Sequence, residues 1–265
     1  MPKLACNYSE ALKDLIINNQ VDIDYIKTGA FGEFEAKIPE MRLMKPVMLH
    51  GLGHFERTGM KNIDIVDFKR ANDLISFCGS FHYGLHLAIT NADMPKILSD
   101  EEIHAIMDKN IKIFKKNINV PLLLENVPDS PEDRTVYDHC PFAEADIISK
   151  VVNDNKTYML LDLSHAGITA EFRDWDVYGY LSGLPLNRVK EIHVNGYGHD
   201  EQGYPCDPHI PMDDSDFERL EWVLKHCSPD IITLEYNGVG QESIEEIKEN
   251  LIKQLKELNR IIGDD

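Results

Sequence analysis

Short apolar segments of this chain repeatedly end in, or contain, a side chain that can bind a metal ion. In chain order these side chains are His50 (MLHGLGH), His86 (GLHLAI), Glu125 (LLLENV), Asp162 (LLDLSH), His193 (EIHVNG) and Glu235 (TLEYNG). A charged carboxylate at the end of an apolar run is costly to bury unless it is paired or bound to metal. The pattern therefore indicates a metal site, in which we predict that Glu125, Asp162 and Glu235 also carry the catalysis.

Three further side chains join this set. Asp207 and His209 form a D-x-H pair after the seventh segment, and His165 follows Asp162 by three residues. The nine ligands together exceed what one zinc or iron ion takes, so two or three ions that share carboxylates are indicated. The ligand atoms are oxygen and nitrogen, and none of them is sulfur. Such ligands are compatible with iron, zinc or manganese, so the identity of the metal remains open.

The order of the segments predicts how the ligands are shared. We expect His50 and His86 to hold one ion, and Glu125 to bridge to a second. The second ion is also held by Asp162, His193 and Glu235, and a third, where present, by Asp207 and His209 with His165.

The other histidines are weaker candidates, and we leave them out of the metal set. His54 is expected to support the site from the loop after the third strand, and His82 to lie deeper in the barrel than His86. The rest fall on expected helices or loops, namely His104, His139, His199 and His226.

The elements that position these residues alternate between short apolar runs and segments of helical periodicity. The expected strands are residues 3–6, 21–28, 46–50, 81–89, 120–127, 158–163, 189–195 and 231–236. Eight βα units predict a single-domain (β/α)8 barrel over residues 1–265, whose ligands collect where the strands end. The first unit is expected to be irregular, because its strand is short and polar residues follow at once.

Three helix starts carry the S-x-x-E spacing of a capping box. The pairs are Ser99 with Glu102, Ser215 with Glu218, and Ser243 with Glu246. The helices after Ser99 and Ser243 each place their apolar residues on one stripe, which can cover a barrel wall.

Composition restricts the class of partner. Of the 265 residues 43% are hydrophobic, which allows a sizeable core, and the formal net charge is −19. Nucleic acid is an unlikely partner on this ground, because binding to phosphates rests on lysine and arginine.

The N-terminal and cysteine patterns indicate a compartment. The start, MPKLACNYSE, lacks a secretory signal, and no stretch approaches the roughly 18 apolar residues of a membrane span. The five cysteines are scattered without a C-x-x-C pair. We therefore expect a cytoplasmic protein that has no membrane partner and no disulfide framework.

Taken together, the motifs HGLGH, GLHLAI, LLLENVP, YMLLDLSHA, LPLNRVKEIHVNG, CDPH and TLEYNG resemble the DUF692 family, the multinuclear non-haem iron-dependent oxidative enzymes (MNIO). The resemblance runs from about Val47 to Gly238. It implies a TIM barrel with two or three irons that oxidises a cysteine-containing peptide or peptidyl substrate, frequently presented by a separate partner protein. Matched motif by motif, it implies the ligands named above except His165, and the D-L-S-H stretch departs from the asparagines common in the family.

Two other functions share the same order of ligands. The D-x-x-H, H, D-x-H, E order is similar to that of endonuclease IV, a phosphodiesterase, and of the xylose-isomerase-like sugar isomerases and epimerases. His165 fits the endonuclease pattern better than the oxidative one. The acidic charge and the segment HIPMDDSDFERLEWVL favour the oxidative family.

Overall fold

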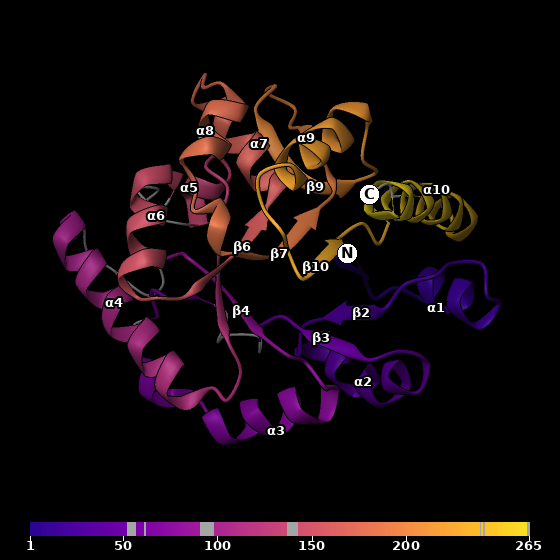
Figure 1. Cartoon of the computed structure of the whole chain (residues 1–265), viewed down its shortest axis with the longest axis horizontal. Coiled ribbons are helices and arrows are strands. Elements are labelled where there is room, and N and C mark those ends of the chain that lie inside the picture. The colour runs from indigo at the N-terminus through magenta and orange to yellow at the C-terminus, as the bar shows by residue number, and fades with distance from the viewer. Residues whose placement is uncertain are drawn as a thin grey trace.

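A barrel of eight parallel strands forms the centre of the computed structural model (Figure 1). The structure describes residues 1–51, 57–60, 62–90, 98–136, 143–238, 240 and 242–263, so His54 and His139 lie outside the described residues. In chain order the strands are β1 (Lys3–Asn7), β2 (Tyr25–Thr28), β3 (Val47–Leu49), β4 (Tyr83–His86), β5 (Leu122–Glu125), β6 (Tyr158–Asp162), β7 (Val189–Val194) and β10 (Ile231–Leu234). Their spatial order, β3-β2-β1-β10-β7-β6-β5-β4, confirms the predicted barrel.

Helices surround the strands on the outside (Figure 1). They are α1 (Glu10–Ile17), α2 (Gly32–Met44), α3 (Phe68–Cys78), α4 (Asp100–Asn117), α5 (Asp133–Val136), α6 (Ala145–Asp154), α7 (Leu163–Phe172), α8 (Val177–Gly183), α9 (Asp214–Leu224) and α10 (Ile244–Gly263), with short 3-10 turns at Ile63–Ile65 and Leu186–Arg188. None of the described helices is long and apolar enough to cross a membrane.

The barrel is irregular at a different place from the one expected. β1 pairs in regular parallel register with both β2 and β10. Among the described residues, β3 instead meets β4 through a single bridge between His50 and Gly84. The imidazole of His50 lies against Gly84. A Cβ added to Gly84 would be 2.6 Å from Nδ1 of this imidazole. The sheet is therefore least regular where a predicted ligand needs room.

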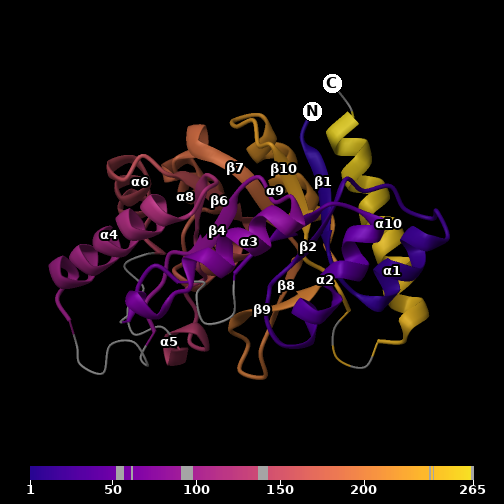
Figure 2. The same ribbon diagram turned by 90° about the horizontal axis from the view of Figure 1, so that it is seen from below.

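A β-hairpin follows β7 that the sequence did not predict. β8 (Gly196–His199) and β9 (Pro205–Ile210) pair antiparallel, and β9 carries Asp207 and His209. The hairpin lacks the apolar alternation that marks a strand, because both of its strands are mainly half-exposed. Figure 2 shows it together with α5 at the end of the barrel opposite the two chain termini, which is the end where the strands finish.

Apolar residues form two separate cores. The larger one lies between strands and helices and includes Leu12, Phe114 and Leu255. A small second cluster contains Ala5, Met48 and Ile231. Since successive strand residues point to opposite faces, and Leu4 and Cys6 belong to the larger core, Ala5 faces the inside of the barrel. The second cluster therefore fills part of the barrel interior.

Two of the three predicted helix caps are confirmed. Ser99 and Glu102 form the reciprocal capping box, and Ser243 and Glu246 exchange the same two hydrogen bonds. The third prediction, at Ser215, is wrong. Asp213 is the N-cap of α9 and forms its capping box with Asp216. The aspartate pair offers the same chemistry two residues earlier, so the helix already includes Ser215.

Two substitutions distinguish the caps that Asp213 and Ser215 would provide for α9. Asp213→Ala should lower the free energy of unfolding by about 1 kcal/mol, because backbone N–H groups of the first turn lose their acceptor. Ser215→Ala should change it by less than half of that, since its hydroxyl is exposed and contacts only the side chain of Asp213. Urea unfolding of both variants gives the comparison, and an equal loss in both would contradict this assignment of the cap.

Candidate metal centre

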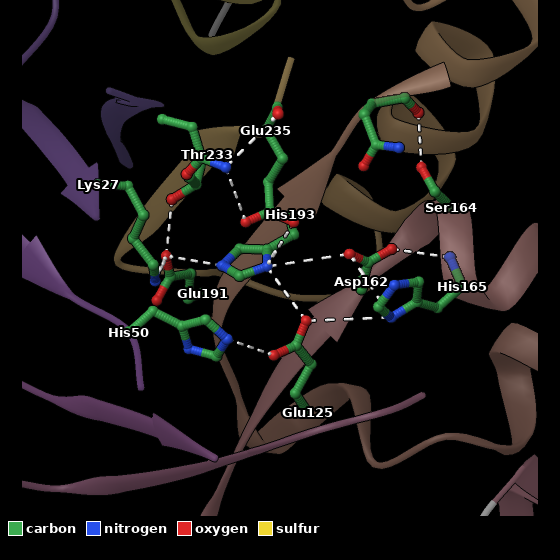
Figure 3. A network of polar contacts seen from close by, with 12 residues as sticks. Lys27, His50, Glu125, Asp162, Ser164, His165, Glu191, His193, Thr233 and Glu235 are labelled. Atoms are coloured by element: carbon green, nitrogen blue, oxygen red, sulfur yellow. Dashed lines mark hydrogen bonds and ion pairs between the residues drawn. The ribbon is translucent and has the colours of Figure 1, made fainter. Parts of the chain in front are cut away.

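Glu125 lies at the middle of the predicted ligand set. It ends β5 and is 1% exposed. One of its oxygens, Oε2, lies 3.0 Å from Nε2 of His50 and 3.4 Å from Nε2 of His86. The other, Oε1, lies 3.2 Å from Nδ1 of His193 (Figure 3). The two oxygens of one carboxylate therefore face two different sets of ligands.

The set on the Oε1 side contains three carboxylates around one imidazole. Nδ1 of His193 lies 3.3 Å from Glu235 Oε2 and 3.9 Å from Asp162 Oδ2, in addition to its contact with Glu125. The ligand atoms of these four residues lie within 4.8 Å of one another, as do those of His50, His86 and Glu125. Two groups that could each hold an ion thus share Glu125, which is the arrangement the sequence predicts.

Several buried atoms at the centre of the cluster lack a hydrogen-bond partner. They are Glu125 Oε2, Asp162 Oδ2 and His193 Nδ1. Leaving buried polar atoms unsatisfied costs free energy, and such cases call for an explanation. One cation beside His50 and His86 would satisfy Glu125 Oε2, and a second would satisfy Asp162 Oδ2 and His193 Nδ1. The donor set therefore fits divalent metal ions.

Charge around the cluster shifts its pKa values strongly. Burial raises the pKa of Glu125, but His86 and His50 outweigh burial and hold it well below its usual value. Burial also raises the pKa of Asp162, to about 7. Burial lowers the pKa of His193, yet Glu235 and Glu125 outweigh this and hold it well above its usual value. The imidazoles thus stabilise the charged form of Glu125, and the carboxylates stabilise the charged form of His193.

The remaining three candidates form an adjoining set. Asp207 Oδ2 lies 3.1 Å from Nε2 of His165 and 3.0 Å from Nε2 of His209. His209 has a left-handed backbone with φ 52°, a conformation that is unusual for a residue with a side chain. His165 joins this set to the first two, because its Nδ1 lies 3.7 Å from Asp162 Oδ2. All nine predicted residues therefore lie at one end of the barrel, while their binding of metal stays a prediction.

Two asparagines that the sequence analysis missed support the ligands. The side-chain amide of Asn126 exchanges two hydrogen bonds of 2.9 Å with the backbone of Asp162. The backbone carbonyl oxygen of Asn126 contacts Nδ1 of His165 at 2.8 Å. A carbonyl only accepts, so Nδ1 donates and Nε2 of His165 is left to face Asp207. Asn195 donates to Asp207 Oδ1 at 2.8 Å. Asn126 directly follows Glu125 and Asn195 comes two residues after His193, and this closeness to a strand-end ligand is the signal that could have identified them.

The position of Asp162 also follows from local structure. It ends β6 and is the N-cap of α7, where its Oδ1 accepts a hydrogen bond of 2.7 Å from the backbone N–H of His165. The N-terminus of a helix stabilises a negative charge. The capping bond uses Oδ1 and leaves Oδ2 turned toward His193 (Figure 3).

The site opens into a cavity of about 320 Å³. His50, His86, Glu125, His165, His209 and Glu235 form one part of its lining, and Tyr8, Phe31, Phe34 and Asn237 form another. A molecule in this cavity would therefore contact both candidate ligands and aromatic side chains.

The histidines left out of the metal set have other partners or positions. His82 is 2% exposed and contacts Glu191 below the site, as its expected depth implied. His199 is exposed and contacts Glu171, and His226 is exposed and lies just beyond α9. His104 lies on α4.

The pKa shifts predict how proton concentration affects metal binding. Burial lowers the pKa of His209, but Asp207 outweighs burial and raises it to about 9. A raised pKa means that the imidazole stays protonated at neutral pH, so a proton must leave before a metal binds. The affinity for Zn²⁺ should therefore rise between pH 6 and 8, by up to about tenfold per pH unit for each proton released.

Calorimetry in buffers of different ionisation enthalpy measures this proton release. His199→Gln is the control, because His199 is exposed and lies outside the cluster, and it should release as many protons as the unchanged protein. A Zn²⁺ affinity that is the same at pH 6 and pH 8 would contradict the prediction.

Comparison with known proteins identifies relatives at the levels of sequence and structure. A family model described as "RiPP precursor modification enzyme MbnB/TglH/ChrH" matches residues 20–260. A UPF0276 protein of Pseudomonas aeruginosa strain UCBPP-PA14 is 24% identical over 206 residues, which are 72% of this chain and 69% of that protein. A UPF0276 protein of Caulobacter vibrioides is 27% identical over 173 residues, 60% of this chain and 58% of the relative.

Solved structures show the fold. A putative xylose isomerase of Rhodospirillum rubrum has a TM-score of 0.68 at 14% identity and covers 98% of this chain and 99% of its own. The IOLI protein with a bound zinc atom has the same TM-score and identity, over 99% and 98%. A family 2 AP endonuclease of Brucella melitensis has a TM-score of 0.58 at 12% identity, over 95% and 97%. The barrel is of the xylose-isomerase-like kind, and the match over residues 20–260 places the chain in the MbnB/TglH/ChrH family of RiPP precursor modification enzymes, confirming the resemblance to DUF692.

Proposed function

We propose that this chain is a multinuclear non-haem iron enzyme that oxidises a cysteine in a peptide or peptidyl substrate. The observation that carries the proposal is the shared position of Glu125, whose two oxygens face two separate groups of potential ligands. A cluster of this kind suits a reaction that needs two ions close together. Membership of a family of RiPP precursor modification enzymes supports a peptide as the substrate.

The residues divide into three sets of ligands. His50 and His86 would hold the first ion together with Glu125, and Glu125 would bridge to the second. The second ion would also be held by Asp162, His193 and Glu235. His165, Asp207 and His209 would hold a third where one binds, since both imidazoles already face one carboxylate oxygen.

Iron is the element that suits an oxidation among those the ligands permit. Bound iron would supply one-electron chemistry with dioxygen and would keep the substrate thiol deprotonated. The protein contributes a fixed set of donors, because Asp162 is held by the start of α7 and by Asn126. It also contributes a cavity that is lined both by the ligands and by aromatic side chains.

The cavity bears on how the substrate is presented. About 320 Å³ accommodates a few side chains rather than a folded protein, so a cysteine would have to enter on an extended or loosely held segment. We propose that a peptide enters in this way, held where needed by a separate partner protein.

One observation favours a second candidate, a metal-dependent phosphodiesterase. His165 follows Asp162 in a D-x-x-H motif and lies 3.1 Å from Asp207, as the endonuclease-like order of ligands implies. The formal net charge of −19 opposes a nucleic-acid substrate. The oxidative function therefore ranks first.

The test begins with metal analysis of protein purified without oxygen. The protein should contain iron and should consume dioxygen when reduced and given a cysteine-bearing peptide encoded near its gene. Glu125→Gln should lower both the iron content and the oxygen consumption, the latter by about 100-fold or more, because an amide cannot bridge two ions as a carboxylate does.

Glu257→Gln is the matched control, since Glu257 pairs with Arg260 on α10 away from the site, and it should keep full activity. A zinc-loaded protein that ignores dioxygen but cleaves DNA at abasic sites would overturn the oxidative proposal in favour of the phosphodiesterase.

A further inference from the structure

A second layer of polar side chains lies inside the barrel, deeper than the candidate ligands. It consists of Lys27 on β2, His82 just before β4, Glu191 on β7 and Thr233 on β10, and we call it the lower polar layer. Each of the four residues is 2% exposed or less. Because residues two apart on a strand share a face, Glu191 lies below His193 and Thr233 below Glu235.

Glu191 is the hub of the lower polar layer (Figure 3). Its Oε1 accepts hydrogen bonds from Lys27 Nζ at 2.5 Å and Thr233 Oγ1 at 2.6 Å. The same oxygen lies 3.2 Å from His193 Nε2. Oε2 contacts His82 Nε2 at 2.5 Å. Lysine and threonine direct their hydrogens at the carboxylate, so Glu191 acts as an acceptor from several sides.

This arrangement determines how His193 presents its ring. Since Glu191 accepts, Nε2 of His193 is the nitrogen that donates, and Nδ1 is the nitrogen left for a metal. Nδ1 is also the atom that lies among Glu125, Asp162 and Glu235 without a hydrogen-bond partner. A carboxylate behind a metal-binding histidine fixes its tautomer and orientation.

A packing role alone does not account for such a layer. Taking a lysine and a glutamate out of water is expensive, and well-packed apolar residues of similar size often serve a protein interior as well or better. Ala5, Met48 and Ile231 pair in register with Thr233, Lys27 and Glu191, so apolar residues fill the barrel interior right beside this layer. The barrel nevertheless buries the pair of Lys27 and Glu191 there, and Glu191 lies 3.2 Å from Nε2 of a candidate ligand, His193.

We propose that Glu191, anchored by Lys27 and Thr233, is a positioning residue that locks His193 in the form that binds metal through Nδ1. The inference rests on the metal-binding part of the proposed function and is independent of the oxidation chemistry. It assigns a purpose to three residues that contact no candidate ion, and it predicts that their loss weakens metal binding at the group formed by Glu125, Asp162, His193 and Glu235.

The test uses Zn²⁺ as a diamagnetic probe, without substrate or dioxygen. Glu191→Gln and Lys27→Met should each weaken Zn²⁺ binding by about 10- to 100-fold, the range for loss of a partner behind a metal ligand. Thr233→Val removes one hydrogen bond to Glu191 and keeps the shape, so it should weaken binding by less. Thr233→Ser restores the hydroxyl and should restore the affinity.

Nitrogen-15 NMR of histidine-labelled, Zn²⁺-loaded protein reads the tautomer directly. His193 should show a metal-bound Nδ1 and a slowly exchanging Nε2–H signal, assigned by its absence in His193→Gln. Glu191→Gln should lose that slow exchange. Arg219→Met is the control for general destabilisation, because it breaks the buried Arg219–Asp216 ion pair on α9. It should lower the melting temperature without changing the signal of His193.

The outcomes separate the inference from the proposed function. If Thr233→Val and Glu191→Gln bind Zn²⁺ as tightly as the unchanged protein and keep the Nε2–H signal, the layer only stabilises the fold and the inference is wrong, while the metal centre stands. If Lys27→Met does not fold, Thr233→Val against Thr233→Ser decides. If the unchanged protein takes up neither Zn²⁺ nor Fe²⁺, both the inference and the proposed function fail.

Discussion

The structure depends on placing a buried carboxylate, Glu125, among imidazoles at the mouth of a barrel. A carboxylate that is 1% exposed is tolerable only when cations or donors surround it. His50, His86 and His193 meet that need from three other strands. Each of these histidines must in turn be held in position by the side chains around it.

The side chains that position the ligands are arranged in layers inside the barrel. The ligands lie at the ends of the strands, the lower polar layer around Glu191 lies beneath them, and Ala5, Met48 and Ile231 fill the interior beside that layer. Outside the barrel the same requirement shapes local structure, since the start of α7 fixes Asp162 and the β8–β9 hairpin supplies Asp207. A parallel barrel makes this possible because all of its strands deliver their last residues to one end.

The barrel and the convergence of the ligands could be predicted because both follow from the periodicity of the sequence. Glu125 and Asp162, for example, are carboxylates that follow apolar runs, which marks them as strand ends. The sequence analysis missed Lys27 and Glu191. These two residues are each other's partners but lie far apart in the chain, and they come into contact only because β2 and β7 face each other across the barrel. The i, i+2 spacing of Glu191 and His193 was the available signal. Asp213 was missed as a cap because Ser215 carries the same motif two residues later, and spacing alone cannot choose between them.

The central claim is that two ions share Glu125, and anomalous X-ray diffraction from crystals loaded with Fe²⁺ without oxygen tests it most directly. Data collected on both sides of the iron absorption edge should show two peaks about 3.5–4 Å apart. One should lie beside His50 and His86 and the other beside His193 and Glu235, with an oxygen of Glu125 bound to each. A single ion held only by Asp207 and His209, away from Glu125, would contradict the account.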